Sequence, residues 1–160
     1  MNNIDSNEKN KKFEFNENLI FNVGNILNPS EFAKENKAAS WLYLNGEEFA
    51  KMEGGISYEQ VQQAIDTSVN IISDPPRELN LELARQHVSA LDKLPRPTLV
   101  TCRKGPRSSA VSYMYSGLRS GADPKDVIAT AEENNAPFCS FQEYKDWVVN
   151  CIETLRKEGV

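Results

Sequence analysis

The sequence predicts an α/β fold with a mainly parallel central sheet flanked by helices, and two observations support this class. Short apolar runs at 40–44, 69–73 and 98–101 have the length and the side chains of buried strands. Stretches with helical spacing of apolar residues lie between these runs and after the last of them. Strands that alternate with helices along a chain form a parallel sheet covered on both sides.

The first strands are expected before residue 45. Apolar residues stand on both sides of the polar turn 16–18, which is the pattern of an N-terminal hairpin over 13–23. Asn28 followed by Pro29 predicts the start of a short helix, because proline fits the first helical position. The run 40–44 then gives a buried strand.

The middle of the chain carries two helix-start signals. Ser57 and Gln60 form a capping box for a helix that precedes the strand at 69–73. Asn80 is placed to cap a second helix, which ends before Pro95 and the strand at 98–101. A βαβ arrangement therefore leads up to residue 102.

Three further helices are expected after that strand. The first begins at Arg107 and stops at Gly121, and the Asp-Pro pair at 123–124 opens the second. The last begins at Ser140, with Glu143 completing a capping box.

Composition limits the classes of function. The 160 residues, 39% of them hydrophobic, suit one domain over 13–160 behind a mobile leader at 1–12 that is rich in Asn and Lys. A net charge of -5 argues against a nucleic-acid surface, and no apolar run reaches the roughly 18 residues that a membrane span needs. Three cysteines, an odd number, indicate reduced thiols and a cytoplasmic protein, while an organelle address stays open.

The stretch LVTCRKGPRSSAV at 99–111 places Cys102 at the end of a strand, before a turn into a helix. Such a turn directs backbone N–H groups and the positive end of the helix dipole at one point, which attracts anions. The same field favours a thiolate, and Arg103, Lys104 and Arg107 add positive charge. A cysteine at a strand end is often a small buried apolar residue, but this combination favours a nucleophile facing an anion site.

Each remaining residue of the loop has an expected part in binding the anion. Gly105 lets the backbone curl around the ligand beside Pro106, and Arg107 is the bidentate clamp for an oxyanion. The hydroxyl of Ser108 or of Ser109 could donate to the cysteine sulfur.

The segment CRKGPRSSA at 102–110, with LPRPTLVT before it and GLRSGADPKDVIATAEE after it, resembles a known family. That family is the bacterial phosphatase-like domain found fused to beta-lactamase-like hydrolases, which is related to dual-specificity protein phosphatases. The resemblance extends from about Ile56 to Asn135. It implies a cysteine phosphatase-like fold with Cys102 as nucleophile and Arg107 as anion ligand.

The loop departs from the protein phosphatases in two ways. Those enzymes separate Cys and Arg by five residues and usually have His before the Cys, whereas four residues separate Cys102 from Arg107 here and Thr101 precedes. The shorter spacing resembles the rhodanese loop, in which the cysteine carries a persulfide. Phosphate ester hydrolysis through a phosphocysteine, sulfane sulfur transfer and non-catalytic anion binding therefore all stay open, each with an anionic partner and without cofactor or metal.

Asp74 favours the phosphatase among these alternatives. Transfer of a phosphoryl group to cysteine needs an acid that protonates the leaving oxygen, and related phosphatases keep an Asp in the loop where Asp74 stands. An Asp that caps a proline turn is the alternative interpretation. Among the other candidates, His87 and Cys151 are assigned to packing, and Cys139 is a possible disulfide partner for an oxidised Cys102.

Overall fold

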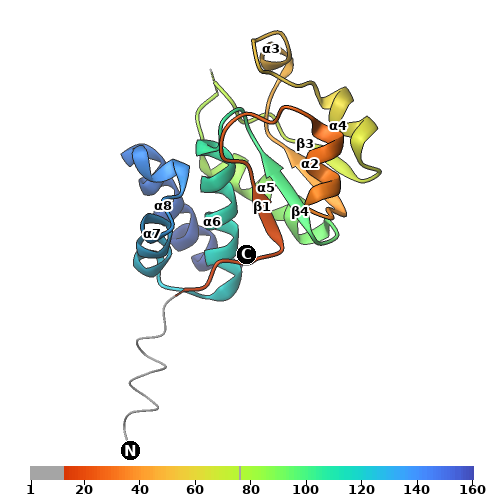
Figure 1. The fold of residues 1–160 in the computed structure, drawn as a ribbon. Helices are drawn as coiled ribbons and strands as arrows, with labels where there is room; N and C mark the ends of the chain where they lie inside the picture. Colours follow the sequence, from red (N-terminus) through yellow and green to blue (C-terminus); the bar gives the residue numbers. More distant parts are fainter. Residues whose placement is uncertain (1–12, 76) are drawn as a thin grey trace, which may run out of the picture.

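A four-stranded, fully parallel sheet forms the centre of the computed structural model, which describes residues 13–75 and 77–160 (Figure 1). The leader predicted at 1–12 lies outside the described residues. The strand order is β1-β4-β2-β3. The strands are β1 (Leu19–Phe21), β2 (Ser40–Tyr43), β3 (Ser68–Asn70) and β4 (Thr98–Thr101). The predicted α/β class with a parallel sheet is confirmed.

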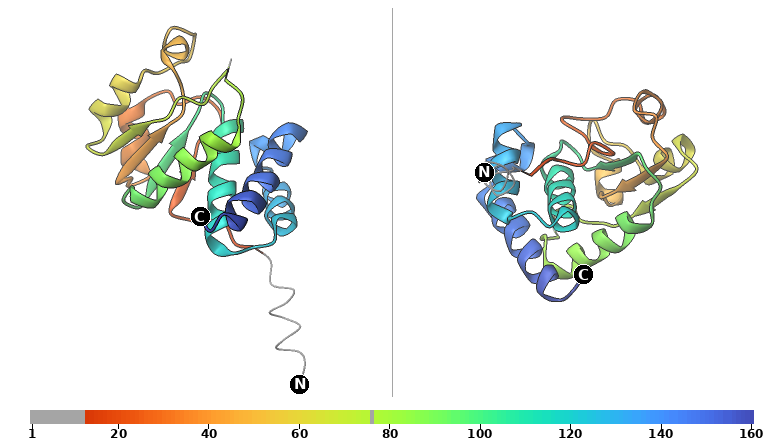
Figure 2. Two further views of the ribbon diagram at one scale, coloured as in Figure 1. Left: turned by 180° about the vertical axis from the view of Figure 1, so that it is seen from behind. Right: turned by 90° about the horizontal axis from the view of Figure 1, so that it is seen from below.

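Helices cover both faces of this sheet (Figures 1 and 2). Trp41 and Tyr43 of β2 pack on one side in a cluster that includes residues of α2 and α4, whereas Leu42 and Leu44 point into a larger cluster with α5 to α8. This alternation follows from the two-residue period of a strand. The helices are α2 (Pro29–Glu35), α3 (Glu47–Ala50), α4 (Tyr58–Ala64), α5 (Leu81–Lys93), α6 (Pro106–Ser120), α7 (Pro124–Glu133), the 3₁₀ helix η1 (Pro137–Ser140) and α8 (Gln142–Lys157).

Most predicted helix boundaries are confirmed by their caps. Asn28, Ser57 and Asn80 each accept a hydrogen bond from the first turn of their helix, and the Ser57–Gln60 capping box is complete. Gly121 ends α6 in the left-handed conformation. None of the helices that the structure describes is both long and apolar enough to cross a membrane.

The predicted N-terminal hairpin is wrong. Residues 13–16 form no strand, and β1 pairs in parallel with β4 instead of with a preceding strand. The aromatic rings of Phe13 and Phe15 lie against Tyr113 of α6, with centroids 6.2 and 4.4 Å from the tyrosine ring. The apolar residues that suggested a first strand are thus used for helix packing.

Three smaller expectations also need correction. Helix α8 begins after Phe141 without a side-chain cap, because residues 137–140 form η1, so the capping box from Ser140 is absent. Strand β3 starts at Ser68 and ends at Asn70, earlier than the predicted 69–73. Helix α3 lies between β2 and α4, a part of the chain for which no helix was predicted.

The topology brings three strand ends to one edge of the sheet. Because β2, β3 and β4 are parallel, the chain segments that follow them lie at the same edge. These segments carry Asn45, Asp74 and Cys102. Ligand sites of open α/β sheets lie at this edge.

Candidate functional site

The turn between β4 and α6 surrounds the sulfur of Cys102 with backbone donors. The N–H groups of Gly105 and Ser108 lie 3.2 and 3.3 Å from Cys102 Sγ. Both groups belong to the start of α6, where the dipole of this 15-residue helix is positive. Two N–H donors thus point at the sulfur that the sequence analysis names as the nucleophile, and that role stays a prediction.

Gly105 is required by both conformation and space. Its φ of 119° is a value that side chains strongly disfavour. A Cβ atom there would lie 2.4 Å from the carbonyl oxygen of Asn22. The close approach of these two backbone segments therefore depends on the absence of a side chain.

Asn22 supports the loop and was not predicted from the sequence. The residue is buried and follows β1. Its Oδ1 accepts hydrogen bonds from Cys102 N (3.1 Å) and Ser108 Oγ (2.8 Å), while its Nδ2 donates to the carbonyls of Cys102 and Gly24, both at 2.9 Å. The available signal was a polar residue directly after an apolar strand, but the pairing of β1 with β4 had to be known to use it.

The two serines of the loop have different positions. Ser108 Oγ lies 3.4 Å from Cys102 Sγ and donates its own hydrogen bond to Asn22. Ser109 Oγ instead donates to the carbonyl of Pro106 and accepts from Phe138 N, each at 3.1 Å. Of the two serines proposed as partners of the sulfur, the structure places Ser108 beside it.

Arg107 connects the cysteine loop to two other segments. Its Nε donates to Tyr144 Oη in α8 at 3.0 Å, and its Nη1 donates to the carbonyl oxygens of Ser73 and of Arg77, the latter at 2.8 Å. Within the described residues, Nη2 is the guanidinium nitrogen without a hydrogen-bond partner. The bidentate contact predicted for Arg107 is therefore not available in this arrangement, because Nε and Nη1 are used within the protein and Nη2 is the nitrogen left for a ligand.

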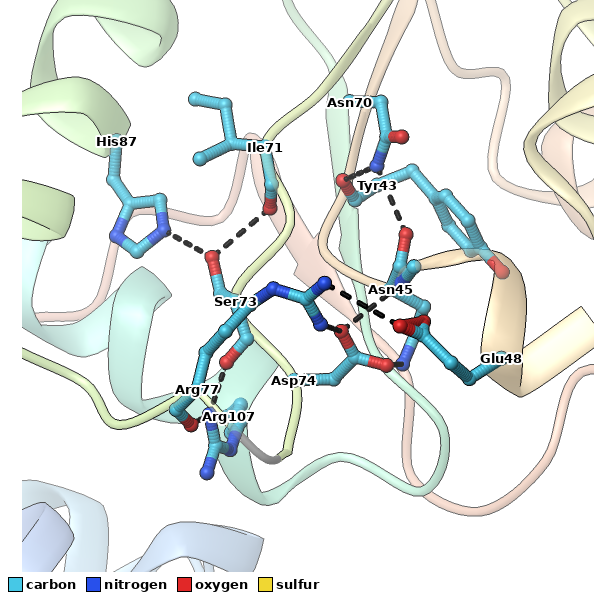
Figure 3. A network of polar contacts seen from close by, with 11 residues as sticks. Tyr43, Asn45, Glu48, Asn70, Ile71, Ser73, Asp74, Arg77, His87 and Arg107 are labelled. Atoms are coloured by element: carbon cyan, nitrogen blue, oxygen red, sulfur yellow. Dashed lines mark hydrogen bonds and ion pairs between the residues drawn. The ribbon is translucent and has the colours of Figure 1, made fainter.

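Asp74 is buried and has donors on both oxygens (Figure 3). Its Oδ1 accepts from Gly46 N at 3.0 Å and lies 3.4 Å from Arg77 Nη1. Its Oδ2 lies 3.4 Å from Asn45 Nδ2. The predicted acid is therefore held by groups from the segment after β2 and from its own loop.

A pocket of about 210 Å³ brings the predicted residues together. Within residues 13–75 and 77–160, the side chains of Arg103 and Lys104 have no ion-pair partner, so their charges are available to an anion. Tyr144 of α8, which was not predicted to be a site residue, also lies at this pocket. The lining residues are Asn45, Asp74, Pro75, Cys102, Arg103, Lys104, Pro106, Arg107 and Tyr144.

His87 and the other two cysteines lie outside the pocket lining. Burial lowers the pKa of His87 to about 3, and its Nε2 lies 2.9 Å from Ser73 Oγ. Burial raises the pKa of Cys151 to about 12 and also raises that of Cys139. A disulfide between Cys102 and Cys139 stays a prediction, since all three cysteines are free.

Comparison of the fold with solved structures finds phosphatases. Tk-PTP in its active form has a TM-score of 0.68 and 10% identity, with 90% of this chain and 97% of that chain covered. A putative phosphatase from Shewanella putrefaciens has a TM-score of 0.63, 17% identity and coverage of 93% and 97%. The core catalytic domain of the PP-IP phosphatase SIW14 from S. cerevisiae has a TM-score of 0.60, 14% identity and coverage of 88% and 82%.

The chain has the fold of these phosphatases. No protein-family model matches the sequence, and no curated protein matches it. Identities of 10 to 17% support the fold and leave the chemistry to be argued from the pocket.

Proposed function

We propose that this protein is a cysteine-dependent phosphatase that hydrolyses phosphoric esters through a phosphocysteine intermediate. One observation carries the proposal: a sulfur that accepts two backbone N–H bonds lines the same pocket as an arginine and a buried carboxyl group. These three groups are the nucleophile, the anion ligand and the acid that phosphoryl transfer to cysteine requires.

In the first step, the thiolate of Cys102 attacks phosphorus and forms an S–P bond while the bond from phosphorus to the ester oxygen breaks. The N–H groups at the start of α6 and the free Nη2 of Arg107 bind the phosphoryl oxygens. Asp74, protonated at this stage, gives its proton to the leaving oxygen, and an alcohol departs.

In the second step, water attacks the phosphocysteine. Asp74, now a carboxylate, takes a proton from this water as the oxygen bonds to phosphorus. The S–P bond breaks, inorganic phosphate leaves and the thiolate of Cys102 is restored. The donors around the sulfur make it a better leaving group in this step.

We further propose that the chain is a member of the phosphatase-like domain family that its loop resembles. The fold shared with phosphatases and the position of Asp74 in the pocket support this assignment. Sulfur transfer through a Cys102 persulfide would need no acid. The cytoplasmic location stays a prediction.

Parallel assays with 4-nitrophenyl phosphate, an alkyl phosphate, and thiosulfate with cyanide test the proposed function. We expect hydrolysis of both esters, and its loss in Cys102→Ser but not in Cys139→Ser. Asp74→Asn should lose roughly 10²-fold on the alkyl ester and much less on the aryl ester, which needs little protonation.

Two other outcomes would contradict the proposal. Turnover of thiosulfate without release of phosphate, together with a mass gain of one sulfur on Cys102, would identify a sulfurtransferase. Absence of both activities, with phosphate still raising the melting temperature, would identify an anion-binding module, since a ligand of the native state stabilises it without chemistry.

A further inference from the structure

Asn45 has a buried acceptor atom that takes part in no hydrogen bond with any described residue. The residue is 2% exposed and lines the pocket together with Asp74 and Cys102. Its Nδ2 lies 3.4 Å from Asp74 Oδ2, whereas its Oδ1 has no partner within the described residues. A buried polar atom without a partner costs free energy, so a native structure that keeps one calls for a state in which it is satisfied.

The backbone on either side of this amide is held in place. Asn70 Nδ2 donates to the carbonyl oxygens of Tyr43 (2.8 Å) and Asn45 (3.1 Å), and Gly46 N donates to Asp74 Oδ1. Asn45 and Asp74 consequently lie side by side at the ends of adjacent strands (Figure 3). Rotation of the Asn45 amide about its Cβ–Cγ bond exchanges Nδ2 and Oδ1 without moving the backbone.

We propose that Asn45 is a positioning residue that holds Asp74 in both of its protonation states. This inference rests on the proposed function, in which Asp74 carries a proton before the first step and has lost it afterwards. When Asp74 is a carboxylate, Asn45 Nδ2 donates to it, as observed. When Oδ2 carries a proton, the rotated amide offers Oδ1 as the acceptor until the leaving oxygen takes that proton.

The other groups that face Asp74 do not offer a free acceptor. Arg77 is a donor and holds Glu48 from α3 at 3.4 Å. Tyr43 of β2, whose pKa burial and the nearby Asp74 raise, directs its hydroxyl hydrogen to the carbonyl of Ile56. Across the pocket, the loop contributes three cations, Arg103, Lys104 and Arg107, and the sulfur of Cys102, which already accepts two N–H bonds.

The test compares Asn45→Leu with Asn70→Leu on the aryl and the alkyl phosphate. Leucine resembles asparagine in size but has no hydrogen-bonding group. We expect Asn45→Leu to lower kcat/KM about tenfold on the alkyl ester and less than about threefold on the aryl ester, because only the alkyl ester depends on the acid. Asn70→Leu removes two bonds to the same backbone without touching Asp74, so any loss should be equal on both esters.

A double-mutant cycle and a pH profile complete the experiment. Asn45→Leu should cause no further loss in the Asp74→Asn background, because the two residues act through one proton. In Asn45→Asp, a second carboxylate disfavours the ionised form of Asp74. The basic limb of kcat/KM on the alkyl ester should therefore move about one pH unit upward.

Equal losses on the two esters, or an undiminished loss in the Asp74→Asn background, would show that Asn45 is only structural and would overturn the inference. If Asn45→Leu does not fold, the Asn45→Asp variant decides: a folded Asn45→Asp with an unshifted pH profile would also overturn the inference. If the wild type hydrolyses the esters and the Asn45 variants have the same activity and pH profile as the wild type, this inference alone is wrong. A wild type that hydrolyses neither ester removes the proposed function as well.

Discussion

The segments that follow β4 and β3 carry Cys102 and Asp74, the proposed nucleophile and the proposed acid, and the two segments are built in different ways. The sulfur of Cys102 accepts N–H bonds from residues three and six positions further along the chain. Asp74 instead depends on Gly46 and Asn45, which follow another strand, and on the side chain of Arg77.

The surroundings of the proposed nucleophile and those of the proposed acid are therefore sensitive to different substitutions. Backbone donors at a helix start survive most substitutions, so the surroundings of Cys102 depend mainly on the path of the loop. Two of the three donors to the carboxyl group of Asp74 are side chains, those of Asn45 and Arg77, so single substitutions can change its surroundings. Variants on each side should therefore separate loss of chemistry from loss of acid assistance.

The largest effect is expected when the proposed nucleophile is replaced. Cys102→Ser should lower hydrolysis of both phosphate esters by about 10⁴-fold, because a hydroxyl in this site is a far weaker nucleophile than a thiolate. The melting temperature should change little, since the two side chains are similar in size. A loss of activity confined to the alkyl ester would show that Cys102, like Asp74, acts only on the leaving group. This result would contradict the different roles proposed for the two segments.

The hydrogen bonds that Asn22 makes to the cysteine loop should contribute more to stability than those that Asn70 makes beside the Asp74 segment. Asn22→Leu removes four hydrogen bonds of less than 3.2 Å and leaves buried backbone groups unpaired, which should cost about 3 kcal/mol of the free energy of unfolding. Asn70→Leu, which removes two bonds beside the Asp74 segment, serves as the matched control and should cost less. Urea unfolding of both variants measures the difference, and equal costs would contradict it.

Arg107 joins the two segments, so its replacement tests whether they act together. Arg107→Lys keeps the charge but loses the planar group that reaches Tyr144 and the carbonyls of Ser73 and Arg77. We expect a loss of about 10²-fold in kcat/KM and weaker inhibition by vanadate. Arg103→Lys, in the same loop, should change either quantity only a few-fold. Similar effects of the two substitutions would remove Arg107 from the role of anion ligand.

A smaller effect is expected on the pH dependence of stability, through His87, which contacts the segment that carries Asp74. His87 forms a hydrogen bond with Ser73. Burial lowers the pKa of His87 to about 3 in the folded protein, whereas its ordinary value, expected in the unfolded chain, is 6.5. The unfolded chain therefore binds a proton that the native chain does not, and stability falls as pH drops below about 6.5. The slope from this group approaches about 1.4 kcal/mol per pH unit. Urea unfolding between pH 7.5 and 5 should show a shallower decline for His87→Gln; parallel curves would show that His87 does not contribute.

The sequence could predict the cysteine side of the pocket far better than the acid side. Cys102, Gly105, Arg107 and Ser108 lie within one loop and one helix turn, so local spacing was enough to predict that they lie together. Asp74 was singled out from the sequence and lines the same pocket as Cys102, but none of its partners could be named. Their positions follow from strand order, which places the segment after β2 beside the segment after β3.

The sequence by itself determined the alternation of strands and helices, the caps at Asn28, Ser57 and Asn80, and the turn that directs N–H groups at Cys102. These features depend on neighbouring residues, whose preferences act before any tertiary contact forms. Only the tertiary structure decided that 13–16 packs on α6 instead of forming a hairpin and that Asn22 supports a loop 80 residues away. It also decided that the amide of Asn45, whose Oδ1 has no hydrogen-bond partner among the described residues, stands next to Asp74. Such contacts depend on which strands become neighbours, and that choice is made by burial of the whole core, which no short segment encodes.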